Sequence, residues 1–323
     1  MKTQRVKSVD VAGGILILWV MAFHAINQSK AFGEVDARVA LPFLTFSMPW
    51  FFYKSGLFFK TEISNRNGFV KDVKKLVIPF LKWSLIGYAM WLAIKAVDGV
   101  LSVETALIYP LETFGIYGYI PVDVPAWFVL SLFFVRVISR YLIHRSVNPI
   151  IIIAVCVSGG FILHLLDNPL PFYVPNILMG IAFFMAGYRF GRHEKKRWLF
   201  GICLVGYLAF QLFGCSIVGH HRNILLTGYY LLWPLFAYTG IVAFNNICRL
   251  IDAAISGSVH WKHRPIAFVG EHTITLLVAH ALVYYPVIHY SPLTPWQTVG
   301  IIFAGYILVF TPVLLIKRKK QQA

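Results

Sequence analysis

The sequence predicts an all-α, polytopic integral membrane protein, and three observations support this fold class. Hydrophobic residues make up 58% of the 323 residues, charged residues make up only 13%, and the mean hydropathy is +0.70. Apolar runs recur at lengths of about 20 residues, which a helix needs to cross roughly 30 Å of hydrocarbon. Because so little polar sequence remains, we expect residues 1–323 to form a single transmembrane domain without a separate soluble core.

Hydropathy divides the chain into about ten expected transmembrane helices. Their ranges are 9–28, 40–59, 76–96, 125–143, 149–166, 172–191, 197–218, 223–245, 266–289 and 297–316. The first range could also belong to a secretory signal peptide, but its apolar run is long and no clean small-residue cleavage pair follows in "NQSKAFGE". An uncleaved first helix is therefore the preferred interpretation.

The formal charge of +16 suggests a nucleic-acid partner, but the positions of the basic residues argue against one. Most of the 29 Lys and Arg residues lie near the termini or in alternate connections, around 2–7, 60–75, 136–145, 189–197, 249–264 and 317–320. The opposite connections hold few of them, namely Lys30, Arg38, Lys95 and Arg222. The positive-inside rule makes the basic face cytoplasmic, and an even number of helices puts both termini there.

Two histidines are expected at the same depth in the bilayer. His24 lies in the 9–28 helix and His280 in the 266–289 helix, which run in the same direction. At 1.5 Å of rise per residue, both lie about 20 Å above the cytoplasmic boundary. Intramembrane ionisable residues are costly and often mark functional sites, although hydrogen-bonded packing residues are the alternative. We expect the two imidazoles to line one cavity, with Asn27 nearer the outer surface.

No metal site is expected among these residues. Carboxylates are almost absent at the depth of the two histidines. The four cysteines, Cys156, Cys203, Cys215 and Cys248, have no paired spacing that would predict a zinc site or a disulfide framework. Buried free thiols are the simpler interpretation.

Two further features lie outside this pair. Lys54, in "MPWFFYKSGLFF", is expected one or two turns from the cytoplasmic boundary, where a lysine can extend to the headgroups. The connection 97–124 is long and rich in apolar residues. We expect it to hold a short interfacial or re-entrant element, either capping an external substrate site or forming a structured surface loop.

Several motifs together resemble the acyltransferase-3 family of bacterial multi-pass membrane proteins. They are "DVAGGILILWVMAFH" ending at His24, "MPWFFYKSGLFF", "KDVKKLVIPF", "PAWFVLSLFF" and "VGEHTITLLVAH" ending at His280. Each motif is weak alone, but the five occur in the family's order along nearly the whole chain. The family's basic residue eleven positions before the histidine is Gly13 here. Because antiparallel neighbours usually pack together, we expect Lys54 to supply the missing charge at the level of Gly13.

The resemblance implies acyl transfer, with acetylation the first expectation, from cytoplasmic acetyl-CoA or another acyl-CoA to a hydroxyl of a cell-surface polysaccharide or lipid-linked sugar. His24 is the expected catalytic residue, either as a general base or as the acyl carrier. The expected donor-binding residues are Lys54, Lys71, Lys74 and Lys75, because basic groups suit the phosphates of coenzyme A. The expected substrate-binding residues are Asn27, Ser55, Trp127 and His280.

The implied location is the bacterial cytoplasmic (inner) membrane, where the protein would serve biosynthesis of the cell envelope. Two alternatives stay open at this point. A flippase or exporter of a polysaccharide or lipid-linked intermediate would also use kinked helices and a polar midplane. A family member without catalytic activity, with a binding or regulatory role, is the second alternative, because Gly13 replaces the family's basic residue.

Overall fold

The computed structural model describes residues 7–35, 42–166, 170–171, 173–212, 232–256 and 265–322. None of these residues forms a strand, which confirms the all-α prediction. In chain order the elements are α1 (Lys7–Gln28), η1 (Pro42–Leu44), α3 (Ser47–Leu57), α4 (Asn65–Asp72), η2 (Val73–Val77), α5 (Ile78–Val97), η3 (Glu104–Ile108), α6 (Tyr109–Tyr117), α7 (Ala126–His144), α8 (Pro149–Leu165), α9 (Tyr173–Phe190), α10 (Arg197–Leu212), α11 (Trp233–Ser256), α12 (Pro265–Glu271), α13 (Thr273–Ala279), α14 (Ala281–Tyr290) and α15 (Pro295–Gln322).

Five stretches of the described chain are long and apolar enough to cross a membrane. They are Ser8–Gln28, Asn65–Val97, Ala126–His144, Thr273–Tyr290 and Pro295–Ile316. Pro149–Leu165 and Arg197–Leu212 are apolar but shorter. The protein is therefore a helical protein with several candidate membrane spans, whereas a total of about ten spans and two cytoplasmic termini stay predictions.

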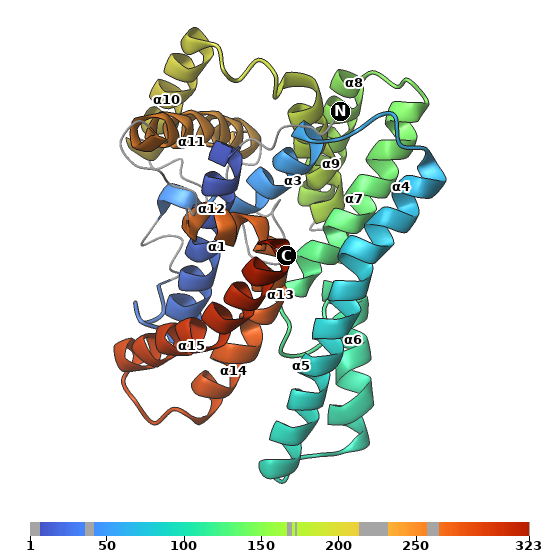
Figure 1. The fold of residues 1–323 in the computed structure, drawn as a ribbon. Coiled ribbons are helices and arrows are strands. Elements are labelled where there is room, and N and C mark those ends of the chain that lie inside the picture. The colour runs from blue at the N-terminus through green and yellow to red at the C-terminus, as the bar shows by residue number, and fades with distance from the viewer. Residues whose placement is uncertain are drawn as a thin grey trace.

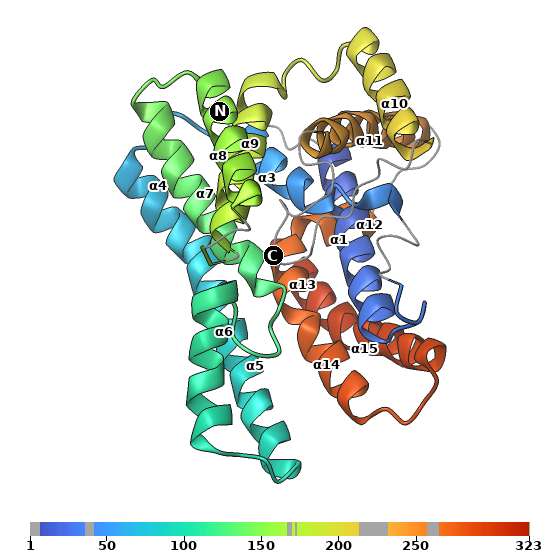
Figure 2. The same ribbon diagram turned by 180° about the vertical axis from the view of Figure 1, so that it is seen from behind.

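The short helix α3 joins two groups of helices (Figures 1 and 2). It packs against α7 and α9 on one side and against α1 and α11 on the other. The prediction of one long helix over 40–59 is wrong for the described part, because α3 covers only Ser47–Leu57, 11 residues or about 16 Å of rise. Pro42 begins the separate turn η1. Pro49 lies in the first turn of α3, where backbone N–H groups have no acceptor within the helix, so the N–H that proline lacks is not needed there.

The helix expected over 76–96 is longer than predicted and begins at Asn65. Ser64 caps its first turn by accepting a hydrogen bond from the Asn67 N–H. The five-residue π-helical stretch η2 then precedes α5, near whose start Pro79 lies. A π-helical turn accommodates a proline that cannot donate its backbone hydrogen bond. The charged residues of "KDVKK" therefore continue the helix rather than preceding it.

The helix expected over 266–289 is divided into α12, α13 and α14. His272 interrupts it with backbone angles φ −111° and ψ 19°, and its Nδ1 bonds to the Phe268 carbonyl at 2.9 Å. This bond offers the carbonyl a side-chain partner in place of the next helical N–H. At His280 the backbone stays helical, so α13 and α14 form one candidate span of 18 residues.

The connection over 97–124 holds η3 and α6, a helical element that lies alongside α5 (Figure 1). Tyr88 donates to the Ala106 carbonyl at 2.6 Å and Trp91 donates to the Thr105 carbonyl at 2.9 Å. The expected local element is thus observed, but it packs along the side of α5. Gly118 ends α6 in the left-handed conformation that glycine favours.

Some predictions fall partly outside the described residues. These include Arg38, Cys215, Arg222, the end of the 197–218 helix and the start of the 223–245 helix. The described part of the latter, α11, continues to Ser256. Its polar residues Asn245, Asn246 and Arg249 bond to Glu194 or to each other.

Helix α1 lies at the centre of one helix group and contacts α3, α11, α12, α13 and α15. Its closest approach is to α12, where two glycines face the neighbouring backbone. A Cβ atom at Gly14 would lie 2.0 Å from the Ile266 carbonyl oxygen, and one at Gly270 would lie 1.7 Å from the Asp10 carbonyl oxygen. Small residues allow such close approach of helix backbones. This contact fixes how α1 sits against α12 and the α13 segment that follows it.

A buried carboxylate ties α3 to α11. Glu194 is fully buried in the turn after α9 and accepts hydrogen bonds from Tyr53 and Asn245, each at 3.1 Å. Arg249 forms an ion pair with the same carboxylate. The Asn245 side chain in turn accepts a 2.7 Å hydrogen bond from the Trp50 indole. Buried charges need such partners, so this network positions the face of α3 that carries Trp50 and Lys54.

Glu194→Ala should destabilise the protein strongly, by about 3 kcal/mol or more, because it leaves Arg249 and two buried donors without their acceptor. Unfolding of the purified protein in detergent micelles measures the effect. The matched control is Glu34→Ala, which removes an exposed carboxylate from an ion pair with Lys30 and should change stability by less than about 1 kcal/mol. Equal effects of the two substitutions would contradict the role given to the Glu194 network.

Candidate active site

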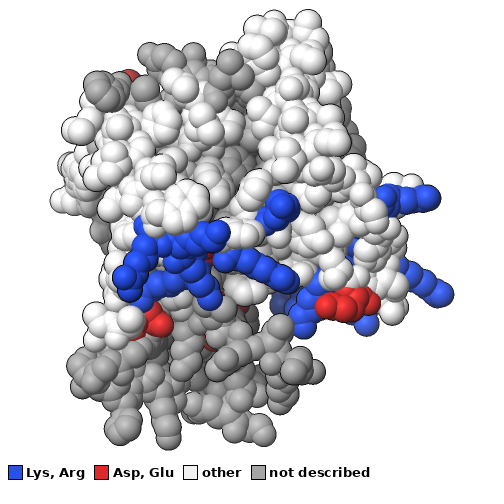
Figure 3. All heavy atoms as spheres, turned by 90° about the horizontal axis from the view of Figure 1, so that it is seen from above, with Lys and Arg blue, Asp and Glu red and all other residues white. Residues whose placement is uncertain are grey.

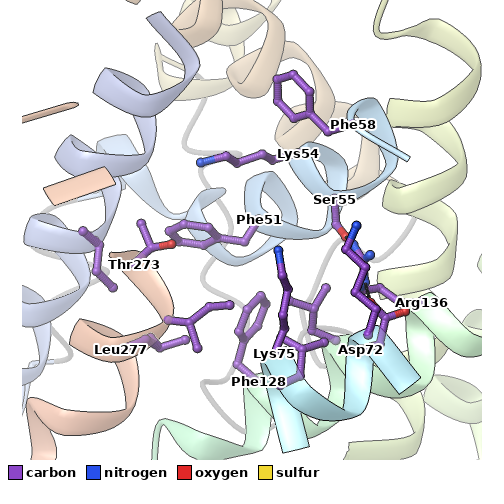
Figure 4. A pocket seen from close by; sticks show the side chains of 15 residues that line it. Phe51, Lys54, Ser55, Phe58, Asp72, Lys75, Phe128, Arg136, Thr273 and Leu277 are labelled. Atoms are coloured by element: carbon purple, nitrogen blue, oxygen red, sulfur yellow. Dashed lines mark hydrogen bonds and ion pairs between the residues drawn. The ribbon is translucent and has the colours of Figure 1, made fainter. Parts of the chain in front are cut away.

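A cavity of about 320 Å³ opens between α1, α3, α4, η2, α7 and α13 (Figure 4). Four cationic side chains line it, together with one carboxylate and two hydroxyl groups: Lys54, Lys71, Lys75, Arg136, Asp72, Ser55 and Thr273. In Figure 4, Lys54 and Lys75 extend from different elements towards the same space. The polar part therefore carries an excess of positive charge and is suited to an anionic group.

Asp72 organises the wall at α7. Its carboxylate is 1% exposed and accepts from Arg136 Nε at 2.8 Å and from Arg140 NH2 at 2.9 Å. Arg136 also donates to Ser55 Oγ at 2.7 Å. One carboxylate thus neutralises only part of the charge of two guanidinium groups. Because Arg136 is held at two atoms, its position in the cavity wall is fixed before any ligand binds.

Lys54 lies beside Gly13, where the sequence predicted a replacement charge. A Cβ atom at Gly13 would lie 3.1 Å from Lys54 Nζ. The ammonium is 3.6 Å from Asp10 Oδ1 and 5.1 Å from the centre of the Trp50 ring. Its side chain is only 21% exposed, so it lies between α1 and α3 rather than extending freely into the surroundings. The shared level of Gly13 and Lys54 is observed, whereas the use of this charge in donor binding stays a prediction.

The other basic residues of "KDVKK" divide into two sets. Lys71 and Lys75 line the cavity, and Lys75 belongs to η2. Lys74 is exposed and is not among the lining residues. Lys71 and Lys75 are four residues apart and therefore lie on one helical face, and Asp72 lines the cavity beside them. Donor binding by Lys74 has no support from its position.

The other residues of the cavity are apolar, and two of them precede the histidines on the same helices. Its apolar residues include Ile17 of α1 and Leu277 of α13, along with Phe51, Phe128, Leu132 and Ile274. Leu277 lies one helical turn before His280, and Ile17 lies two turns before His24. At 1.5 Å per residue these separations are about 4.5 Å and 10.5 Å along the helix axes. The cavity thus combines a basic end with an apolar end that approaches the imidazoles.

His24 and His280 are adjacent, as their matched depth predicted. Their ring centres are 5.2 Å apart, and Tyr284 lies 6.0 Å from His24 and 5.7 Å from His280. The Tyr284 ring is nearly parallel to that of His24, at 6°. His280 is fully buried and His24 is 9% exposed. The three rings form one packed group. The two imidazoles are thus adjacent, but neither lines the cavity described above, and a cavity lined by both stays a prediction.

The tautomer of His280 follows from its backbone contact. Its Nδ1 lies 3.0 Å from the Leu276 carbonyl oxygen, which can only accept a hydrogen bond. Nδ1 therefore carries the proton, and Nε2 carries the lone pair. Among the described residues, Nε2 of His280 and the hydroxyl of Tyr284 receive no hydrogen-bond partner. Buried polar atoms without a hydrogen-bond partner are rare in proteins as a whole. Where they do occur, they often mark the place where a ligand or a reacting group binds.

A buried carboxyl group lies next to this aromatic group. Asp123, in the connection between α6 and α7, is fully buried and accepts a hydrogen bond from Ser84 at 3.2 Å. It lies close enough to Tyr284 to interact with it electrostatically. Burial raises the pKa of the Asp123 carboxyl well above its usual value, while the Ser84 hydrogen bond opposes this shift.

The remaining predicted site residues are separated from one another. Ser55 lies at the basic end of the cavity, bonded to Arg136, rather than beside the imidazoles. Trp127 is buried and packs edge-to-face on Phe128, whose ring lines the cavity. Asn27 is near the end of α1, about one turn beyond His24. The substrate-binding roles of Asn27, Ser55 and Trp127 stay predictions.

Sequence reasoning missed several polar residues of the site: Asp72, Asp123, Arg136, Arg140 and Tyr284. Arg136 and Arg140 were assigned only to the basic side of the membrane, although their spacing of four residues puts them on one helical face. Asp123 directly precedes the "PAWF" motif, which was the available signal. Nothing in the spacing of Tyr284 distinguishes it from the other tyrosines of α14.

The surrounding surface is basic. Figure 3 views the molecule from the top of Figure 1, and Lys and Arg side chains outnumber acidic ones over the described part of this face. Exposed basic residues of the connections predicted to be cytoplasmic include Lys60, Arg66, Lys74, Arg145, Arg192, Lys195 and Lys196. A positive surface attracts anionic ligands and raises their local concentration.

Comparison with known families gives one match. The model of the acyltransferase-3 family, described as an acyltransferase domain, matches residues 6–318, essentially the whole chain. This match confirms the resemblance inferred from the five motifs. No curated protein and no solved structure matches the chain significantly.

Asp123→Asn should raise the melting temperature, and the gain should grow as the pH rises above about 4. The folded protein holds the Asp123 proton to a higher pH than the unfolded chain does. The stability that this proton contributes is complete below the unfolded pKa and is lost as the pH rises towards the folded pKa. Asparagine has no proton to lose and keeps an oxygen for the Ser84 hydroxyl.

Melting curves of the purified protein in detergent, recorded between about pH 4 and pH 8, measure this trend. Glu112→Gln, which alters an exposed carboxyl group on α6, is the control and should show no comparable gain. If the melting temperatures of Asp123→Asn and the natural protein differ by the same amount at every pH, this contradicts the assignment of a buried, protonated carboxyl.

Proposed function

Because the chain belongs to the acyltransferase-3 family, we propose that this membrane acyltransferase moves an acyl group, acetyl in the simplest case, from a cytoplasmic acyl-CoA to a hydroxyl of a cell-surface polysaccharide or lipid-linked sugar. The proposal includes a location in the bacterial inner membrane and a role in building the cell envelope. The family match favours group transfer over export of the glycan alone.

The observation that carries the proposal is the cavity with a basic end and an apolar end. Coenzyme A is anionic at its phosphates, whereas its acyl-bearing arm is largely uncharged. Lys54, Lys71, Lys75 and Arg136 at one end suit the phosphates. The apolar end approaches His280 along α13 and His24 along α1. A donor bound in this orientation has its thioester directed towards the imidazoles.

The chemistry requires one proton acceptor beside the thioester. In the direct route, His24 takes the proton of the acceptor hydroxyl while the oxygen attacks the thioester carbonyl carbon. The carbon–sulfur bond then breaks, and the coenzyme A thiolate leaves and takes the proton from the imidazolium. In the alternative route, the imidazole nitrogen that carries the lone pair attacks the carbonyl, the carbon–sulfur bond breaks, and the thiolate leaves with the imidazolium proton. The acceptor oxygen then attacks the acyl-imidazole, and the imidazole leaves with the hydroxyl proton.

His280 and Tyr284 support either route. With its proton on Nδ1, His280 presents the lone pair of Nε2, which can accept a hydrogen bond from the acceptor hydroxyl. Tyr284 packs parallel to the His24 ring and limits its rotation. Both residues are fully enclosed by protein, where electrostatic interactions are stronger than in water.

His24→Ala should lower acyl transfer by about a thousandfold, because general-base catalysis contributes factors of this order. Transfer of radiolabelled acetyl from acetyl-CoA to membrane glycan or lipid measures the loss. His193→Ala, at an exposed position after α9, is the control and should keep full transfer. Near-normal transfer by a folded His24→Ala protein would contradict the proposed role. Acyl label on the natural protein before acceptor is added, if hydroxylamine releases it as it does from an acyl-imidazole, would favour the acyl-carrier route.

Lys54→Met should raise the KM for acyl-CoA about tenfold or more, because it removes a charge-assisted contact with the donor phosphates. Gly13→Arg combined with Lys54→Met should recover part of this loss, since a side chain at Gly13 projects towards the space of Lys54 Nζ. The control is Lys82→Met, which removes an exposed lysine of α5 outside the cavity lining. An unchanged KM in Lys54→Met would show that Lys54 serves only packing or interfacial contact.

A further inference from the structure

An apolar groove of about 580 Å³ lies on the other side of α1, between α1 and α15. Most of its residues come from these two helices, and the rest come from η1, α12 and α13. They include Leu18, Trp19, Met21, Tyr306, Ile307 and Phe310. No charged residue is among them. A groove of this composition accepts hydrocarbon and does not suit a free sugar.

The groove opens on a face suited to lipid. Of the five candidate spans, Pro295–Ile316 is the least buried, with 22% of its most apolar window enclosed. Ile307 is 66% exposed, while Phe310, on the same helix, is 6% exposed and packs inside. A hydrocarbon chain in the bilayer could therefore enter the groove sideways, without crossing a polar surface.

The basic cavity that contains Lys54 and Arg136, called the donor cavity below, and the groove lie on opposite faces of α1. Ile15, Leu18, Trp19 and Ala22 follow helical spacing along the groove, whereas Ile17 points to the donor cavity. The same division occurs on α13, where Leu276 lines the groove and its neighbour Leu277 lines the cavity. His280 lies about one turn beyond both leucines along the chain, and it lines neither space.

Tyr306 connects the groove to the imidazoles. It lines the groove, its ring lies 6.3 Å from that of His280, and its hydroxyl donates to the Met21 carbonyl at 3.5 Å. Met21 is itself a groove residue, three positions before His24. The inner end of the groove is thus separated from the His24–His280 pair by one layer of side chains.

We propose that this groove binds the hydrocarbon chain of a lipid-linked acceptor, which places the acceptor head group beside Tyr306, next to the His280–His24 pair and on the side of α1 opposite the acyl donor. The identification of the bound lipid as the acyl acceptor rests on the proposed function. The proposal selects a lipid-linked sugar over a free polysaccharide as that acceptor. Binding of the chain itself does not depend on acyl transfer and can be measured alone.

The molecule offers a matched comparison. A second apolar depression, of about 560 Å³, lies between α8, α9 and α11, and its residues include Val157, Phe183 and Leu235. Leu235 is 57% exposed, similar to Ile307. No residue lining this depression has a ring contact with His24 or His280. An ordinary membrane lipid should fill both depressions alike, whereas a specific acceptor chain should prefer the groove beside α15.

The experiment uses the full chain in phosphatidylglycerol nanodiscs with a polyprenyl phosphate that carries a photoreactive diazirine in its chain. After irradiation, peptide mapping locates the label. We expect label on α1 and α15, displaced by unlabelled polyprenyl phosphate but not by added phosphatidylglycerol. Ile307→Trp should lower this labelling about tenfold, because the indole excludes several methylene groups from the groove. Leu235→Trp should leave it unchanged.

Label divided equally between the two depressions, or displaced equally by phosphatidylglycerol, would show ordinary boundary lipid only and would overturn the proposal. Thermal melting of both tryptophan variants confirms that they fold. Binding of acetyl-CoA to the same preparations is measured separately. If the natural protein does not bind acetyl-CoA, this contradicts the proposed function. The labelling pattern is independent of that result and alone decides which lipid occupies the groove.

Discussion

The close contact between α1 and α12 is the constraint on which the rest of the site depends. Gly14 and Gly270 each face a neighbouring backbone at a distance that leaves no space for a Cβ atom. This approach brings α13, which follows α12, against α1, so that His24 meets His280. It also leaves Gly13 beside the space that Lys54 fills from α3. The imidazole pair, the position of the lysine and the two spaces on either side of α1 all follow from one backbone contact.

The charged side chains of the site are stabilised by hydrogen-bond and ion-pair partners rather than by exposure to water. Glu194 fixes the face of α3 that presents Lys54, and Asp72 fixes Arg136 in the cavity wall. Each carboxylate is buried and satisfied by more than one donor, which offsets part of the cost of removing it from water. The result is a preorganised positive end in the cavity. Because Asp72 binds two guanidinium groups, an anionic ligand would complete the charge balance.

Much of the fold could be predicted from hydropathy, since helices near 125–143, 149–166 and 172–191 begin and end within a few residues of the expected positions. Failures occurred where a local interaction overrides hydropathy, as at Pro42 and Pro49 near α3 and at His272 between α12 and α13. In the site, depth along the helices predicted that His24 and His280 could meet. The contacts of Asp123, Tyr284 and Arg136 depend on rotation of each helix about its axis, which depth does not specify.

The central claim is that an acyl-CoA lies in the basic cavity with its acyl group directed at the imidazole pair. An experimental structure of the full chain with a non-hydrolysable acetyl-CoA analogue tests it most directly. The account predicts phosphates in contact with Lys54, Lys71, Lys75 or Arg136, and the acyl carbonyl within hydrogen-bond reach of His24 or His280. An analogue bound outside this cavity, or one whose acyl group points away from α1 and α13, would contradict it.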